Sequence, residues 1–110
     1  MDYVTVARVG EIPEGEGRAF DVGQVPVAVF NCGGRFFAVG DVCSHAQALL
    51  HEGSLDAVRL TVECPLHGSE FDLRNGEVLT PPATDPVATY VVRVQEGEIQ
   101  VGLVARGSAR

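Results

Sequence analysis

The chain contains Cys43-Ser44-His45 and, after 18 further residues, Cys64-Pro65-Leu66-His67. These two stretches hold two of its three cysteines and two of its three histidines. Four thiolate and imidazole ligands at such short internal spacing suit structural zinc. They suit equally an iron–sulfur cluster in which two histidines replace two cysteines on one of two irons. Both interpretations predict that the two stretches meet around one metal centre.

The sequence around these stretches indicates strands. Hydrophobic residues alternate with polar ones along most of the chain, and no segment carries a convincing helical stripe. Turn residues separate the alternating segments, which predict strands over 3–7, 18–22, 25–31, 35–39, 58–63, 70–73, 77–79, 89–95 and 98–104. Asn75-Gly76 is the strongest hairpin motif among the turns. Many short strands with frequent turns predict an all-β sandwich or barrel-like fold.

Length and composition limit the classes of protein. A chain of 110 residues forms one domain that can bury a core without disulfides, and three cysteines cannot make a closed disulfide framework. It has neither a signal-peptide layout nor an apolar run long enough to cross a membrane, so we expect a cytoplasmic protein. The net charge of −7 disfavours nucleic acid and anionic lipid. That charge serves either solubility or steering toward a basic protein surface.

The predicted strands place the four candidate ligands on loops. Cys43 and His45 follow the strand that ends near Val39, and Cys64 and His67 follow the strand that ends at Glu63. Two loops at strand ends can approach each other and hold a metal between them.

The residues beside the ligands resemble a known family. Cys-x-His, then Cys64-Pro65-Leu66-His67-Gly68-Ser69-Glu70-Phe71-Asp72, with Asn75-Gly76-Glu77 and Pro81-Pro82-Ala83 following, is similar to the Rieske [2Fe–2S] signature. The resemblance extends over about residues 2–104 to the soluble Rieske-type ferredoxins. It implies a single Rieske domain over 1–104, built as an antiparallel β-sandwich with a cluster-binding subdomain at about 41–80. Residues 105–110 are expected to form a flexible tail.

The resemblance also implies the cofactor and its ligands. One [2Fe–2S] cluster per chain would be bound by Cys43 and Cys64 on the inner iron, and by His45 and His67 on the outer, solvent-facing iron. Two ferric ions, two sulfides, two thiolates and two neutral imidazoles sum to zero charge. An electron is easier to add to this neutral centre than to an all-cysteine dianion, so the reduction potential rises.

Two differences from the respiratory-chain members of the family bear on the potential. Those members have a disulfide between the ligand loops, where this chain has Ala48 and Leu66. They also have a tyrosine in place of Phe71, whereas Ser69 is retained and could donate to a bridging sulfide. One donor fewer predicts a potential in the lower part of the Rieske range.

The function implied is electron transfer without a catalytic residue. The protein would be a monomer that takes one electron from a reductase, expected to contain flavin, and passes it to an oxygenase or similar acceptor. The alternatives are a small subunit of an assimilatory nitrite reductase and an iron–sulfur accessory or sensor module. Outside the motif, Cys32 in a Gly-Gly turn is expected to be a partly exposed thiol. His51 is expected to be a surface side chain near the site.

Overall fold

The computed structural model describes residues 2–44, 47–66 and 68–105. The elements within these ranges are β1 (Tyr3–Arg8), η1 (Val9–Glu11), β2 (Gly17–Val22), β3 (Val25–Cys32), β4 (Arg35–Gly40), η2 (Leu50–Glu52), β5 (Ser54–Asp56), β6 (Thr61–Glu63), β7 (Glu70–Asp72), β8 (Thr89–Tyr90), β9 (Val92–Gln95) and β10 (Glu98–Gly102), where η marks a short 3₁₀ turn. They form three antiparallel sheets with the orders β1-β10-β9, β2-β3-β4-β8 and β5-β6-β7. The predicted all-β, antiparallel class is confirmed.

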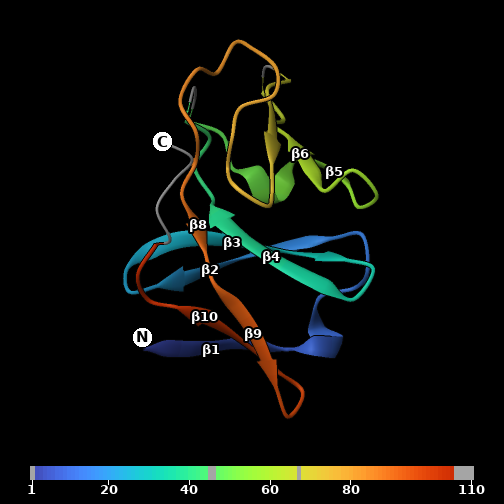
Figure 1. Ribbon diagram of the computed structural model, residues 1–110, viewed down its shortest axis with the longest axis vertical. Helices are drawn as coiled ribbons and strands as arrows, with labels where there is room; N and C mark the ends of the chain where they lie inside the picture. Colours follow the sequence, from blue (N-terminus) through green and yellow to red (C-terminus); the bar gives the residue numbers. More distant parts are fainter. Residues whose placement is uncertain (1, 45–46, 67, 106–110) are drawn as a thin grey trace.

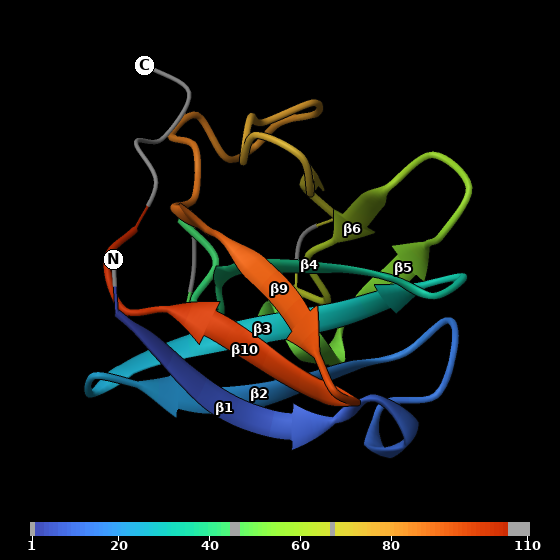
Figure 2. The same ribbon diagram turned by 60° about the horizontal axis from the view of Figure 1, so that its bottom comes forward.

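The sheets follow one another along the long axis of the molecule. In Figure 1 the sheet β1-β10-β9 lies at the bottom, β2-β3-β4-β8 in the middle, and the hairpin β5-β6 at the top. Figure 2, turned by 60°, shows β10 and β1 crossing in front of β3 and β2. Within the described residues, no helix is long and apolar enough to cross a membrane.

Strand β3 is central because both of its faces are buried. Val27 and Val29 enter the core between the bottom and middle sheets. Ala28, Phe30 and Cys32 enter a second core, between the middle sheet and the upper part of the chain. Since successive side chains of a strand point to opposite faces, a continuous apolar run can build both cores at once. The second core, called here the upper core, contains the candidate metal-binding cysteines.

The predicted strand at 58–63 is wrong in its first half. Asp56 Oδ1 accepts the N–H groups of Val58 at 3.1 Å and Arg59 at 3.0 Å, and its carbonyl accepts the N–H of Leu60 at 2.8 Å. These bonds fold 57–60 into a turn, in which Leu60 has a φ of +62° and Val58 is 92% exposed. The alternating pattern therefore hid a hairpin, in which the unpredicted β5 pairs with β6.

The predicted strand at 89–95 is also divided. Its first part, β8, pairs with β4 in the middle sheet, whereas β9 pairs with β10 in the bottom sheet. The chain changes sheets at Val91, so one apolar run serves two sheets. The chain reverses at the predicted Asn75-Gly76 turn, with Asp72 N–H bonded to the carbonyl of Glu77 at 2.9 Å. The predicted strand at 77–79 is wrong, however, because the pairing there is a single bridge between Phe71 and Val78.

Candidate metal centre

Two cysteines from distant parts of the chain converge in the upper core. Cys43 lies three residues beyond β4, and Cys64 directly follows β6. Their exposed fractions are 3% and 2%, and both belong to the same buried apolar cluster. His45 and His67 lie outside the described residues, so the ligand roles of all four side chains stay predictions.

The first ligand loop is closed by its own backbone. The N–H of Cys43 donates to the carbonyl of Ala48 at 2.8 Å, and Val42 pairs with Leu49. Closer to the middle sheet, the N–H of Leu50 donates to the carbonyl of Asp41 at 2.7 Å. These paired segments, 41–43 and 48–50, are called here the stem of the loop. Cys43 is therefore held at the neck of a short hairpin-like loop that extends from the middle sheet.

The second ligand loop is a tight turn. The N–H of Gly68 donates to the carbonyl of Cys64 at 3.1 Å, and the N–H of Cys64 donates to the carbonyl of Ser69 at 2.7 Å. Gly68 has a φ of +81°, which glycine adopts without the strain that a Cβ would impose. Six residues, 64–69, connect β6 to the antiparallel β7, and Cys64 is the first of them.

A third segment, residues 80–86, is tied to both ligand loops. The hydroxyl of Ser44 donates to the carbonyl of Asp85 at 2.5 Å, and the N–H of Ala83 donates to Ser69 Oγ at 2.9 Å. The N–H of Glu70 donates to Thr80 Oγ1 at 2.9 Å. The sequence predicted only an irregular, proline-rich connection here, because hydroxyl-to-backbone bonds over such separations leave no local pattern.

Ser69 and Phe71, predicted to tune the cluster, are both fully buried. Ser69 Oγ accepts a bond from Ala83, which leaves its O–H proton available to donate elsewhere. The amides of Cys43, Cys64 and Gly68, by contrast, already donate to carbonyls of their own loops. Phe71 pairs with Val62 and belongs to the upper core together with both cysteines.

Cys32 differs from its prediction. It is 5% exposed, ends β3 and packs in the upper core, so the expected partly exposed thiol is wrong. Burial raises the pKa of the Cys32 thiol, and the nearby Arg35 guanidinium offsets only part of that rise. The side chain is thus a small apolar group and a poor nucleophile at neutral pH.

His51 also differs from its prediction, and it has a partner that the sequence did not suggest. Its side chain is only 24% exposed, and Nδ1 lies 2.7 Å from Oδ2 of Asp41, whose side chain is 2% exposed. Asp41 was not singled out by any motif, because one carboxylate two residues before a cysteine is an ordinary pattern.

The described residues fit an iron–sulfur cluster. Two buried cysteines lie on loops that close toward the same apolar core, and the buried Ser69, whose hydroxyl has a proton to donate, lies on the loop that begins at Cys64. Thiolates suit both zinc and iron–sulfur clusters, but a buried O–H donor is of use chiefly to a cluster, whose sulfur atoms accept hydrogen bonds.

Comparison with known proteins separates these two metals. A family model described as the Rieske [2Fe-2S] domain matches residues 2–91. The 3-phenylpropionate/cinnamic acid dioxygenase ferredoxin subunit of Escherichia coli (strain K12) is 45% identical over 103 residues, which cover 94% of this chain and 95% of that protein. The solved ferredoxin of carbazole 1,9a-dioxygenase from Nocardioides aromaticivorans IC177 has a TM-score of 0.88 and 39% identity, covering 92% of this chain and 97% of its own.

A third similar protein was solved together with its acceptor. It is a chain from the complex of reduced oxygenase and oxidized ferredoxin in carbazole 1,9a-dioxygenase, with a TM-score of 0.88, 34% identity and coverage of 96% and 97%. The zinc alternative has no counterpart in these matches, and the relatives are named as ferredoxins rather than as catalytic subunits. The chain therefore belongs to the Rieske [2Fe–2S] family, as an electron carrier with one [2Fe–2S] cluster and not an enzyme in its own right.

Proposed function

We propose that this ferredoxin delivers single electrons to the terminal oxygenase of an aromatic-ring dioxygenase. The observation that supports the proposal most directly is the difference in burial between the inner and outer sides of the two ligand loops. Their cysteines are buried, while their outer sides present exposed apolar side chains at the same end of the molecule. A carrier of this kind needs a cluster shielded from water and a surface on which a partner can exclude water.

The proposed docking groove lies between the two loops. It is a hollow of about 320 Å³ lined by Gln47, Ala48, Leu49, Glu52, Pro65 and Leu66. Leu49 is 37% exposed and Leu66 is 56% exposed, although Leu49 pairs with Val42, next to the buried Cys43, and Leu66 is two residues from the buried Cys64. Apolar side chains at this exposure are typical of the centre of a transient protein interface.

The net negative charge of the chain is concentrated in the segment that contains this groove. Residues 41–85 contain eight carboxylates and two arginines, a net charge of −6, whereas the rest of the chain has seven carboxylates and six arginines, a net charge of −1. Glu52 is the acidic residue that lines the groove itself. An acidic segment beside an apolar groove favours a partner with a basic surface, and it accelerates encounter at low ionic strength.

The chain's own residues prepare the site for a single electron. When bound, the cluster supplies one-electron oxidation and reduction. Burial of Cys43 and Cys64 excludes water from the thiolate side, and the hydrogen bonds within each loop keep both cysteines in place when the charge changes. The Ser69 hydroxyl, with its proton free to donate, can stabilise the added negative charge.

The proposal also includes the electron donor, a flavin-bearing reductase, and the compartment, the cytoplasm. A flavin-bearing reductase suits a one-electron carrier, because flavin accepts hydride from a nicotinamide and can release electrons singly. Three cysteines without a disulfide framework support a reducing compartment, the cytoplasm. The protein would act as a monomer, so that one groove can meet reductase and oxygenase in turn.

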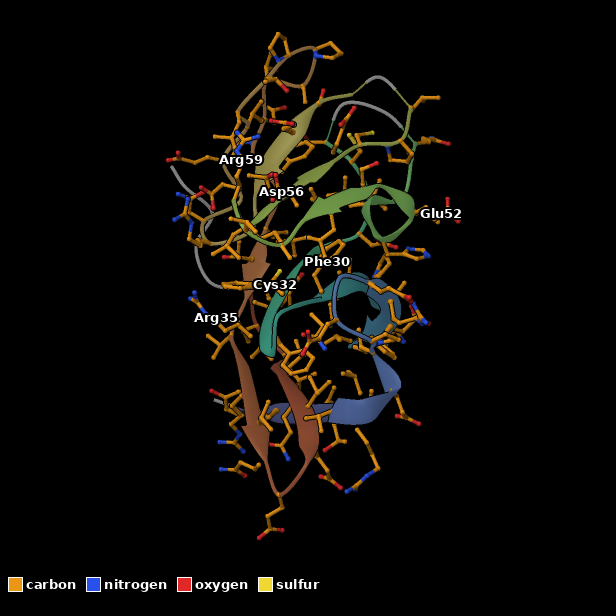
Figure 3. The ribbon with its side chains drawn as sticks, turned by 90° about the vertical axis from the view of Figure 1, so that its right-hand side faces the viewer. Phe30, Cys32, Arg35, Glu52, Asp56 and Arg59 are labelled. Carbon is orange, nitrogen blue, oxygen red and sulfur yellow. The ribbon has the colours of Figure 1, made fainter. Side chains whose placement is uncertain are left out.

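The experiment is stopped-flow oxidation of the reduced ferredoxin by its oxygenase, with Leu66→Ser compared with Val58→Ser. Val58 is 92% exposed and follows Asp56, which lies with Arg59 away from Glu52 and its groove (Figure 3). We expect Leu66→Ser to slow transfer by about tenfold or more, as for a central interface side chain, at unchanged iron content. Val58→Ser should leave the rate unchanged. Equal rates for both variants would remove the groove from the docking surface.

The alternative of a nitrite reductase subunit has less support. The relatives at 45% and 39% identity are both named as dioxygenase ferredoxins. A sensor module is likewise disfavoured, because the exposed apolar groove provides for a partner that binds and leaves. Rapid reduction of an aromatic-ring oxygenase, with none of a nitrite reductase, would separate the two acceptors.

A further inference from the structure

Asp41 is a buried carboxylate at the base of the first ligand loop. Its side chain is 2% exposed, and each of its oxygens has a partner in His51. Oδ1 accepts the backbone N–H of His51 at 2.8 Å, and Oδ2 lies 2.7 Å from Nδ1 of the same residue. One side chain thus binds a residue ten positions later by both its backbone and its ring.

The backbone of Asp41 joins the loop to the middle sheet. Its N–H donates to the carbonyl of Pro26 in β3 at 3.0 Å, and its carbonyl accepts the N–H of Leu50 at 2.7 Å. Val42 then pairs with Leu49, and Cys43 donates to Ala48. The Asp41–His51 contact therefore lies at the end of the stem next to the middle sheet, and the bond from Cys43 to Ala48 lies at the other end.

The other side of His51 faces a small hollow rather than a second anchor. This hollow, of about 190 Å³, is lined in part by Glu16, Arg18 and Phe30. Glu16 and Arg18 form an ion pair with each other at 2.8 Å, so their charges are matched without His51. Asp41 is thus the partner that holds the ring of His51.

A buried carboxylate is a poor device for stability alone, because an apolar side chain of similar volume often stabilises a fold as well or better. Its hydrogen bonds are directional, however, and they fix which residues of the stem lie opposite each other. A shift of one residue in this stem would move Cys43 to the other face.

We propose that Asp41 and His51 are a positioning pair: they fix the register of the first ligand loop and thereby hold Cys43 at the cluster. The inference rests on the proposed ligand role of Cys43. Iron content and the visible spectrum of the wild-type protein test that role separately.

The test is the rate at which an iron chelator bleaches the holoprotein at 25 °C. Asp41→Leu removes both bonds to His51, and we expect bleaching to be about tenfold faster, equivalent to about 1.4 kcal/mol. His51→Ala removes the ring bond but keeps the backbone bond, so its acceleration should be smaller. Asp41→Asn can keep both bonds, with the ring in its other neutral tautomer, and should bleach at nearly the wild-type rate.

Asn31→Leu provides the matched control. Asn31 is also buried, and its side chain makes two bonds, to the carbonyl of Ile12 at 2.7 Å and from the N–H of Gly34 at 2.8 Å, away from the ligand loop. This variant should lower the thermal midpoint without faster bleaching at 25 °C. Hydrogen exchange over residues 42–51 should be faster in Asp41→Leu and unchanged in Asn31→Leu and Asp41→Asn.

Three results would contradict the proposal. Bleaching of Asn31→Leu as fast as that of Asp41→Leu would attribute the effect to general loss of stability. Bleaching of Asp41→Asn as fast as that of Asp41→Leu would show that the hydrogen bonds do not hold the loop. If Asp41→Leu does not fold, His51→Ala and Asp41→Asn decide the matter, since a His51→Ala rate equal to wild type contradicts the role of the ring.

Discussion

Gly53 is a point at which the chain leaving the first candidate ligand loop passes close to the strand that leads to Cys64. It lies between η2 and β5, beside the carbonyl of Glu63. A Cβ added there would overlap the carbonyl oxygen of Glu63 and would lie 3.1 Å from the carbonyl carbon of Glu63. It would also lie 3.2 Å from the carbonyl oxygen of Leu50. All of these neighbours are backbone atoms, so none can rotate away.

Gly53→Ala should therefore separate the two ligand-bearing segments. Restoring ordinary contact requires the Glu63 carbonyl to move by about 1 Å or more. Overpacking of this kind costs about 1–3 kcal/mol, and the upper end applies because backbone must move. A loss of about 3 kcal/mol lowers the thermal midpoint of a domain this size by about 10 °C or more. Because Glu63 directly precedes Cys64, the cluster should also be lost faster to a chelator.

Gly10→Ala is the control for this change. A Cβ at Gly10 meets nothing within 4 Å, so the variant should be as stable as wild type or slightly more stable, because alanine restricts the unfolded chain. Thermal unfolding of both holoproteins, followed by circular dichroism and by cluster absorbance, provides the comparison. Midpoints for the two variants within about 2 °C of each other would refute the steric argument.

Three further predictions concern the potential, the pH dependence and the thiol. The wild-type midpoint potential should be at or below about zero, within a Rieske range of about −150 to +300 mV, and Phe71→Tyr should raise it in voltammetry if the new hydroxyl reaches the cluster. A wild-type value above about +150 mV contradicts the low-potential interpretation. Hydrogen bonds from Arg74 hold the pKa of Asp72 below its ordinary value of 3.8. The stabilisation of the fold by the Asp72–Arg74 ion pair is therefore complete above that value and is lost as the pH falls through the lower pKa of the folded state. Urea titrations should show Asp72→Asn less stable than wild type by about 1 kcal/mol at pH 7, and the gap should close under acid; a gap independent of pH excludes the ion pair as its cause. Cys32→Ser should leave iron content and visible spectrum unchanged, and cluster loss with an intact fold would mean that the ligands were assigned wrongly.

The sequence predicted those parts of the fold in which local pattern and tertiary role agree. The hairpin of β2 and β3 was found because Gly23-Gln24 interrupts two alternating runs, and both residues adopt positive φ there. The turn at 57–60 was missed because its cause is one Asp56 side chain that bonds two backbone amides ahead of it. Val58 is apolar, yet it lies at the tip of that turn.

The candidate site divides in the same way. Spacing identified Cys43 and Cys64 as candidate ligands, and the motif that contains Ser69 and Phe71 identified them as candidate tuning residues; the structure shows all four to be buried, and their roles stay predictions. The Asp41–His51 contact and the bond from Ser44 to Asp85 were not found, because each joins residues whose spacing matches no known motif. The exposure of Cys32 was predicted wrongly because the two glycines after it suggested that Cys32 itself lies in the turn. In the structure β3 extends through Cys32, and the turn begins one residue later.

The predicted histidine coordination is the property that would most clearly distinguish this electron carrier from an all-cysteine ferredoxin. Pulsed electron paramagnetic resonance on the reduced protein, prepared with ¹⁵N-labelled histidine, reports directly on ring nitrogens bound to iron. We expect two strongly coupled histidine nitrogens, unchanged in His51→Gln and reduced in number or lost with the cluster when His45 or His67 is replaced by alanine. A paramagnetic reduced cluster without any coupled histidine nitrogen would contradict the assignment of Cys43, His45, Cys64 and His67 as its ligands.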